Sequence, residues 1–173
     1  LAHAPLGGRS PSHVDNEPVW AALAEAGIPI MLHVGGGGGG IIDRNWHRNG
    51  RPRPVDIHGG GENLRSKDLP SVHHGAETFL TCLVLDGVFD RHPGLRCGVI
   101  ELGASWAGSF MDRLDFAARA FARTEPLVAG LELKPSEYLR RQVRFTPFPG
   151  EDVGNMIAQH GPELYLFSSD YPH

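Results

Sequence analysis

The sequence contains 173 residues, which is long enough for one domain with a sizeable hydrophobic core. Hydrophobic residues make up 40% and charged residues 21% of the chain, as in an ordinary globular protein. The net charge of −4 does not suit a nucleic-acid-binding surface, and no apolar run approaches the ~20 residues of a transmembrane helix. We therefore expect neither nucleic acid nor a membrane among the partners of this chain.

The first predicted elements are a helix over residues 16–26 and a strand over residues 28–34. Asp15 or Asn16 can cap the helix, Pro18 suits its first turn, and Gly27 ends it. The run IPIMLHV that follows is almost continuously apolar, which predicts a strand buried on both faces. His33 lies at the C-terminal end of this strand.

A long polar segment over residues 35–71 separates this strand from the next helix. It begins with six glycines and contains the GxGxxG pattern of dinucleotide-binding loops at Gly35, Gly37 and Gly40. That fingerprint needs a helix that opens at the third glycine, and IIDRNWHRNG offers none. We therefore interpret the glycine run as a hinge and the segment as a loop that covers a site or is disordered.

The rest of the chain continues to alternate between helix and strand. HHGAETFLTCLVLDGVF has helical spacing, with Ala76, Phe79, Leu80, Leu83, Val84 and Val88 on one face. Further elements are expected as a strand over 95–101, helices over 104–123 and 135–140, a strand over 143–148, a helix over 152–159 and a strand over 164–167. This order predicts one domain of βα units on a parallel sheet, without internal repeats. A closed eight-stranded barrel takes about 250 residues, so the chain is too short for a whole one.

Three acid–base or metal-binding side chains fall at the C-terminal ends of separate predicted strands: His33, Glu101 and Asp170. In a parallel barrel these ends converge on one mouth, where catalytic residues are found. A histidine and two carboxylates there can bind a divalent metal ion and leave a carboxylate to move protons. The alternative is that each is an ordinary strand-end residue satisfied by the backbone.

A second candidate centre is Ser105, in ELGASWAG, which is close to the nucleophile elbow GxSxG at a strand-to-helix turn. Asp170 and His173 follow it in the chain order of a serine hydrolase triad. However, Ala107 replaces the second glycine, and Asp170 and His173 are crowded into one loop. The favoured interpretation of Ser105 is therefore a helix N-cap.

The sequence resembles the amidohydrolase-related superfamily, in particular the branch that includes aminocarboxymuconate-semialdehyde decarboxylase. The similar stretches are WAALAEAGIPIMLHVG, LVLDGVFDRHPGLRCGVIELGASW, KPSEYLRRQVRFTPF and LYLFSSDYPH, in this order. The resemblance implies a distorted (β/α)8 barrel, of which residues 1–173 would form a single domain with about strands 4–8, truncated at both ends. Residues 35–71 would be a Gly/Arg-rich active-site loop.

The resemblance also implies roles for individual residues. His33 would be the metal ligand of the fifth strand, and Asp170 the eighth-strand aspartate that binds metal or takes a proton from its water. Glu101 stands where decarboxylases of the branch usually have a histidine, and it would act as a base or ligand. His173 would interact with Asp170 without binding the metal itself. The His-x-His pair of the family's first strand does not occur in this sequence.

The function expected on this basis is metal-dependent hydrolysis of a small, carboxylate-bearing substrate, with zinc as the expected metal and manganese as the alternative. Arg44, His47 and Arg65 of the loop would contact the substrate, since guanidinium binds carboxylate; a solvated loop face is the alternative. Three other functions stay open: a non-oxidative decarboxylase, a serine hydrolase, or a fragment that is inactive alone. An open half-barrel has unpaired strand edges, so we also expect self-association as a homo-oligomer.

The two cysteines, Cys82 and Cys97, lie in apolar segments and form no CxxC pair. They are predicted to be buried free thiols in a reducing compartment, and we therefore expect a cytoplasmic protein.

Overall fold

The computed structural model describes residues 6–34, 41–57, 59 and 64–169, and of Leu6 and Arg44 only the backbone. Its α-helices are α1 (Glu17–Ala26), α2 (His74–Leu85), α3 (Val88–Arg91), α4 (Ala107–Phe121), α5 (Pro126–Ala129), α6 (Pro135–Gln142) and α7 (Val153–His160). The strands are β1 (Ile30–His33), β2 (Cys97–Ile100) and β3 (Val143–Phe145). Within these ranges no helix has the length and apolar character needed to span a bilayer.

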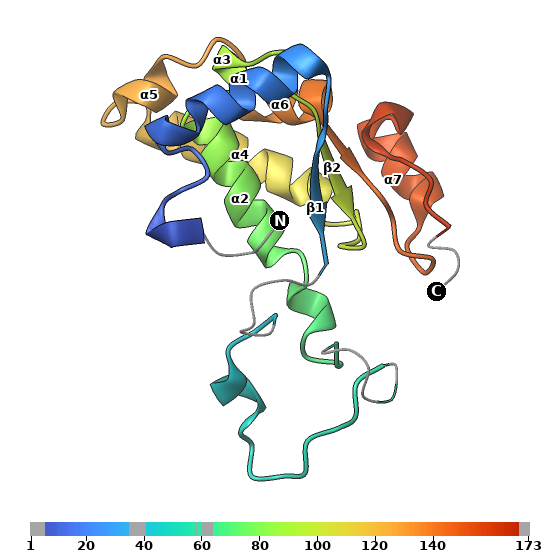
Figure 1. Cartoon of the computed structure of the whole chain (residues 1–173). Helices are drawn as coiled ribbons and strands as arrows, with labels where there is room; N and C mark the ends of the chain where they lie inside the picture. The colour runs from blue at the N-terminus through green and yellow to red at the C-terminus, as the bar shows by residue number, and fades with distance from the viewer. Residues whose placement is uncertain (1–5, 35–40, 58, 60–63, 170–173) are drawn as a thin grey trace.

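The three strands form one parallel sheet in the order β1-β2-β3, which confirms the predicted alternation of helix and parallel strand (Figure 1). His33 is paired with Ile100, and Cys97 with Val143. Since all three strands run the same way, their carboxyl ends lie at one edge of the sheet. Residues 41–57 and 64–71 form a separate lobe below this edge (Figure 1).

The prediction of a strand over residues 164–167 is wrong. Leu164 closes the short 3-10 helix η5 (Pro162–Leu164), which Pro162 begins. After it, one parallel bridge joins Tyr165 to Phe145, and the Leu166 N–H donates to the Phe145 carbonyl at 2.9 Å. The segment thus lies in the position of a fourth strand beside β3 but makes too few ladder bonds to count as one.

β1 also departs from its prediction, because it is buried on one face only. Ile30 and Leu32 belong to the core, whereas Met31 is 44% exposed and His33 is exposed as well. The helices α2, α4 and α6 contribute to the core cluster on the Ile30 and Leu32 face. β2 is buried as predicted at Cys97, Gly98 and Val99.

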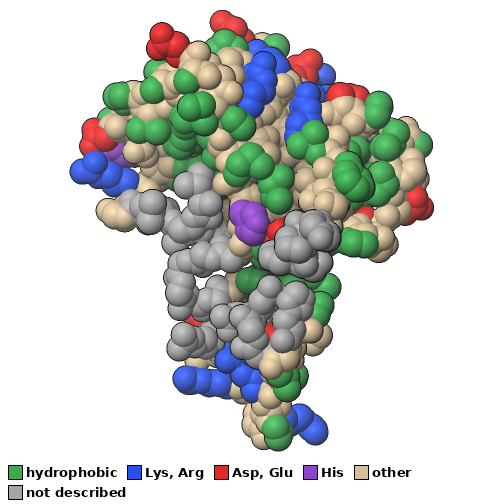
Figure 2. Space-filling model, turned by 45° about the vertical axis from the view of Figure 1, so that its right-hand side comes forward, with side chains coloured by type: hydrophobic (Ala, Val, Ile, Leu, Met, Phe, Trp, Pro, Cys, Tyr) green, Lys and Arg blue, Asp and Glu red, His purple; other side chains and the backbone are tan. Residues whose placement is uncertain are grey.

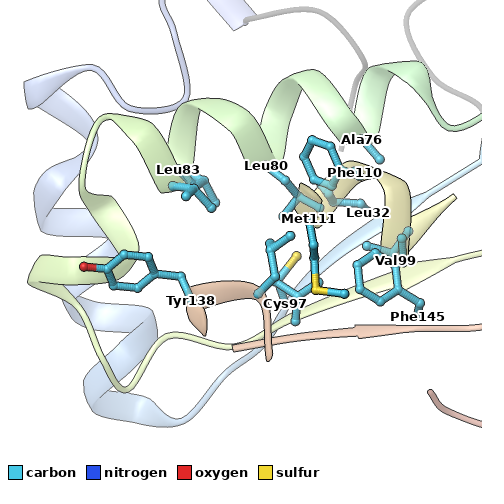
Figure 3. Packing of buried hydrophobic residues seen from close by; sticks show 14 of the residues in the cluster. Leu32, Ala76, Leu80, Leu83, Cys97, Val99, Phe110, Met111, Tyr138 and Phe145 are labelled. Atoms are coloured by element: carbon cyan, nitrogen blue, oxygen red, sulfur yellow. The ribbon is translucent and has the colours of Figure 1, made fainter. Parts of the chain in front are cut away.

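The core is built from the apolar stripes of α2 and α4 packed on the sheet (Figure 3). The predicted stripe is confirmed within α2, where Ala76, Leu80, Leu83 and Val84 are buried and Phe79 is partly buried. The helix ends at Leu85, however, and the buried Val88 belongs to α3. The buried stripe of α4 stops before the end of the helix: Leu114 belongs to the core cluster but Phe121 is 53% exposed.

The cysteine prediction is confirmed in part. Cys82 and Cys97 are both free, but only Cys97 is fully buried, while Cys82 is partly exposed. Burial raises the pKa of the Cys97 thiol to about 12, so this thiol stays protonated and unreactive.

Glu17, the first residue of α1, connects this helix to the end of α3. Its carboxylate accepts hydrogen bonds from the Arg91 guanidinium and from His92 Nε2, the latter at 2.7 Å. The Arg91 bond, opposed by burial and reinforced by the His92 bond, lowers the pKa of Glu17 from its ordinary 4.5. Because the folded pKa is lower than the unfolded one, this contact stabilises the fold above about pH 4.5 and is lost as the pH falls through the folded value.

We expect Glu17→Gln to reduce the free energy of unfolding by about 1 kcal/mol at pH 7 and to have almost no effect near pH 3. Urea unfolding at both pH values measures this difference. Glu25→Gln, on the exposed surface of the same helix, is the matched control and should behave like the wild type. Identical pH dependence in the wild type and Glu17→Gln would contradict the assignment.

Candidate active site

His33 and Glu101 meet at the carboxyl edge of the sheet. His33 is the last residue of β1, and Glu101 directly follows β2, whose last residue Ile100 is paired with His33. The register therefore brings the two side chains together, with His33 Nε2 3.2 Å from Glu101 Oε1. Two of the three residues predicted to converge thus lie in direct contact. Figure 2 shows a histidine beside an acidic side chain at the junction of the main body and the lower lobe.

The hydrogen bond of the other ring nitrogen defines the chemistry of His33. Its Nδ1 lies 2.7 Å from the backbone carbonyl oxygen of Val34. A carbonyl oxygen can only accept, so Nδ1 carries the proton and the lone pair of the neutral ring is on Nε2. That nitrogen faces Glu101, and the side chain of His33 remains 53% exposed. In the neutral ring Nε2 is thus available to a proton or a metal ion.

Glu101 has an unusual backbone conformation. Its φ of +56° is the left-handed region, and no other non-glycine residue in the described ranges has a positive φ. Side chains other than Asn and Asp rarely adopt it, and such strain is concentrated at functional sites. Gly103, two residues later, has φ +67°, and a Cβ there would lie 2.9 Å from Phe148 Cδ2. The turn after β2 therefore depends on a backbone that packs closely against the segment following β3.

Thr146, directly after β3, holds the start of this turn. Its hydroxyl accepts a hydrogen bond from the Glu101 N–H at 3.1 Å and lies 3.3 Å from the Val99 carbonyl, to which it donates. The Thr146 N–H donates to the same carbonyl at 3.0 Å. Thr146 is only 3% exposed, so these bonds are shielded from water. Sequence reasoning missed this residue, because the strand predicted over residues 143–148 placed Thr146 in its interior, whereas β3 ends at Phe145.

Glu151, also missed, holds the second half of the turn. Its carboxylate accepts hydrogen bonds from the N–H groups of Ala104, Ser105 and Phe148 at 2.8–3.2 Å. Burial raises the pKa of Glu151, but the Ser105 hydroxyl and these N–H groups outweigh it and lower the pKa overall. The carboxylate is therefore charged at neutral pH.

The contacts of Ser105 differ from those of either predicted role. Trp106, not Ser105, is the N-cap of α4, so the N-cap interpretation is wrong by one residue. The hydroxyl and the N–H of Ser105 both bind Glu151, and the nearby ring of His73 stacks on Trp106 at a centroid distance of 5.0 Å. A serine that donates to a carboxylate and has no hydrogen bond to a histidine among the described residues does not have the geometry of an activated nucleophile.

The loop residues predicted to contact a substrate interact within the loop itself. His47 Nε2 lies 3.2 Å from Asp68 Oδ1, with both side chains mostly buried. The Arg65 N–H donates to Asp68 Oδ2, and Arg65 Nε donates to the Pro54 carbonyl. Arg65 Nη1 is buried without a hydrogen-bond partner in the described ranges. Within residues 41–57 and 64–71, Asp68 therefore connects His47 with Arg65. Arg44 is the first residue of the short helix η3 (Arg44–His47).

The remaining predicted site residues, Asp170 and His173, lie outside the described residues. The glycine run at 35–40 also lies outside them, so its interpretation as a hinge stays a prediction. Within the described ranges, no group of three or more His, Cys, Asp or Glu side chains is arranged to hold a metal ion. His33 and Glu101 thus supply two possible ligands of a centre that would need further ones.

Comparisons of the sequence and of the structure with known proteins both point to amidohydrolases. A sequence model of the family described as Amidohydrolase matches residues 2–173. Among solved structures, an amidohydrolase from Mycobacterium avium subsp. paratuberculosis K-10 is similar, with 28% identity over 95% of this chain and 38% of its own length, and a TM-score of 0.69. A search of curated proteins found no match.

Two decarboxylases share the fold at lower identity. The 5-carboxyvanillate decarboxylase of Novosphingobium aromaticivorans DSM 12444, solved with manganese and 4-hydroxy-3-methoxy-5-nitrobenzoic acid, is 20% identical over 98% of this chain and 45% of its own, with a TM-score of 0.65. The 2,6-dihydroxybenzoate decarboxylase from Rhizobium is 18% identical over 94% of this chain and 46% of its own, with a TM-score of 0.57. The chain thus spans less than half the length of these three structures.

Proposed function

The chain belongs to the amidohydrolase family, and from this we propose that it supplies part of the active site of a metal-dependent hydrolase of a small, carboxylate-bearing substrate. The observation that carries the proposal is the pair of His33 Nε2 and Glu101 Oε1, 3.2 Å apart at the carboxyl edge of the parallel sheet. Residues 1–173 would form one part of a (β/α)8 barrel. That assignment agrees with the coverage of 38–46% of the three similar structures.

The two side chains fit a divalent metal ion. Metal-binding histidines usually donate their second ring nitrogen to a carbonyl or carboxylate, as His33 Nδ1 does to Val34. His33 Nε2 would be one ligand and the Asp170 carboxylate another, a set that suits zinc and that manganese also accepts. His173 would support Asp170, and the centre would need further ligands. When bound, the metal would lower the pKa of a water molecule and polarise a substrate oxygen.

The residues of the chain would move and hold the protons. Glu101 Oε1 would accept a proton from the attacking water and return it to the leaving group, as a general base and then an acid. The left-handed backbone at Glu101, φ +56°, keeps this carboxylate in place beside His33. His33 keeps its own proton on Nδ1 through the Val34 carbonyl, so its Nε2 stays directed at the site.

The loop would bind the acidic part of the substrate. Arg65 is the strongest candidate, because its Nη1 has no hydrogen-bond partner in the described part of the chain while its Nε and backbone are anchored at Pro54 and Asp68. An anchored guanidinium loses little freedom when it binds a carboxylate. Arg44 and the His47–Asp68 pair would shape the same part of the loop.

Non-oxidative decarboxylation is the second candidate, favoured by the names of two structural neighbours. In that reaction the bond between the substrate carbon and its carboxyl group breaks, carbon dioxide leaves, and the carbon takes a proton. Protonated Glu101 could supply that proton from the same position. Assays on carboxylate-bearing aromatic substrates distinguish the two reactions, since only decarboxylation releases carbon dioxide.

The test is elemental analysis of the whole protein that contains this chain. We expect near-stoichiometric zinc or manganese, lost in His33→Ala and in Asp170→Ala. His13→Ala is the matched control, because His13 caps the short helix η2 (Val14–Asn16) and its partly exposed ring lies beside Asp15. Absence of metal from the wild type would overturn the proposal, and labelling of Ser105 by a fluorophosphonate would then favour a serine hydrolase.

A further inference from the structure

The turn that carries Glu101, residues 101–106, is fixed by side chains from another part of the chain. Thr146 binds the N–H of Glu101 at its start, and Glu151 binds the N–H groups of Ala104 and Ser105 at its end. Both come from the segment between β3 and α7, about 45 residues away in sequence. The turn therefore has its shape only when this segment is in place.

Glu151 is the most connected of these side chains. One carboxylate oxygen, Oε2, accepts from Ala104 at 2.9 Å and from Phe148 at 2.8 Å, and the other, Oε1, accepts from Ser105 at 2.9 Å. It thereby bridges the turn after β2 and the segment after β3. Only a carboxylate can accept at two oxygens at once, because an amide of the same shape has one acceptor oxygen and two N–H donors.

The turn leaves little room for another arrangement. Gly103 has φ +67°, and a Cβ at this position would lie 3.0 Å from Glu151 Oε1 as well as against the Phe148 ring. The Trp106 indole N–H binds the carbonyl oxygens of Leu102 and Gly103 at 3.0 and 2.9 Å. The strained backbone of Glu101 is thus held in place by hydrogen bonds to the turn on both sides.

We infer that Glu151 is a positioning residue of the His33–Glu101 site, which keeps the Glu101 carboxylate beside His33 through the backbone of the turn. This inference rests on the proposed function and adds a residue to it. Glu151 itself touches neither His33 nor Glu101 in any described contact. Its effect on the reaction passes through the backbone of the turn, from Ala104 and Ser105 to the left-handed Glu101.

The test is a double-mutant cycle in the whole protein, with turnover and hydrogen exchange as readouts. Glu151→Gln should lower kcat by about 10–100-fold with little change in KM, as residues that orient a site do. In a Glu101→Gln background the same substitution should have almost no further effect, because the group it positions is already gone. Glu151→Asp, which keeps two acceptor oxygens, should recover part of the lost kcat.

Hydrogen exchange separates the turn from the reaction. In Glu151→Gln the amides of Ala104 and Ser105 should exchange at least about tenfold faster. Asp152→Asn is the matched control: Asp152 caps α7 by accepting from the Asn155 N–H, and its removal should leave both kcat and these amides unchanged. A variant that fails to fold is recognised by faster exchange over the whole core.

Two results would overturn the inference. One is that Glu151→Gln lowers kcat by the same factor in the wild type and in the Glu101→Gln background. The other is that the amide hydrogens of Ala104 and Ser105 exchange faster in Glu151→Gln while kcat does not change. Failure of the proposed function is recognised separately, because it shows as a wild type without metal or turnover, before any variant is compared.

Discussion

Glu101→Gln is expected to lower the kcat of the proposed reaction in the whole protein by about 10²- to 10⁴-fold, the usual effect of removing a general acid–base group. Glutamine keeps the size of the side chain and its place 3.2 Å from His33 Nε2 but cannot take or give a proton. Because the backbone of the turn is bound through Thr146 and Glu151, the substitution should leave the fold intact. Steady-state kinetics and a urea unfolding curve measure both effects.

Glu163→Gln is the matched control for this substitution. Glu163 is half exposed and pairs with Arg140 at 3.3 Å, far along the chain from the turn. An exposed ion pair contributes about 0–1 kcal/mol, so this variant should retain wild-type kcat and nearly wild-type stability. Wild-type turnover in Glu101→Gln would remove Glu101 from the reaction and leave His33 as the functional residue of the pair.

Phe145→Ala is expected to reduce the free energy of unfolding by about 3–5 kcal/mol, a large part of the stability of a domain. Phe145 is completely buried at the end of β3 (Figure 3). Its ring packs edge-to-face on Trp106, with ring centroids 5.2 Å apart. Its carbonyl also accepts from the Leu166 N–H, so β3 connects the core with the segment that leads to Asp170. Alanine would leave a cavity between β3 and the start of α4.

Phe116→Ala removes the same atoms from a side chain that is 67% exposed on α4. It should change the free energy of unfolding by no more than about 0.5 kcal/mol. Urea unfolding followed by tryptophan fluorescence compares the two variants under identical conditions. Similar midpoints for both would show that Phe145 is not part of the packed core.

Much of the fold was predictable because the signals are local. The buried stripe of Ala76, Leu80 and Leu83 follows from helical spacing, and Gly27 ends α1 in the left-handed conformation, φ +66°, that glycine favours. The residues around β1 were harder, because an apolar run does not show how many faces will be covered. Met31 is 44% exposed although it belongs to the same apolar run as the buried Leu32.

The sequence by itself determined the order of helices and parallel strands and placed His33 and Glu101 at strand ends, because periodicity and strand polarity depend on near neighbours. Only the tertiary structure decided that these two side chains touch, since their contact follows from the pairing of His33 with Ile100. The same holds for Glu151, whose partner Ser105 lies 46 residues away. A hydrogen bond of that range forms only once the pairing of β2 with β3 has fixed both backbones, and no local pattern contains that information.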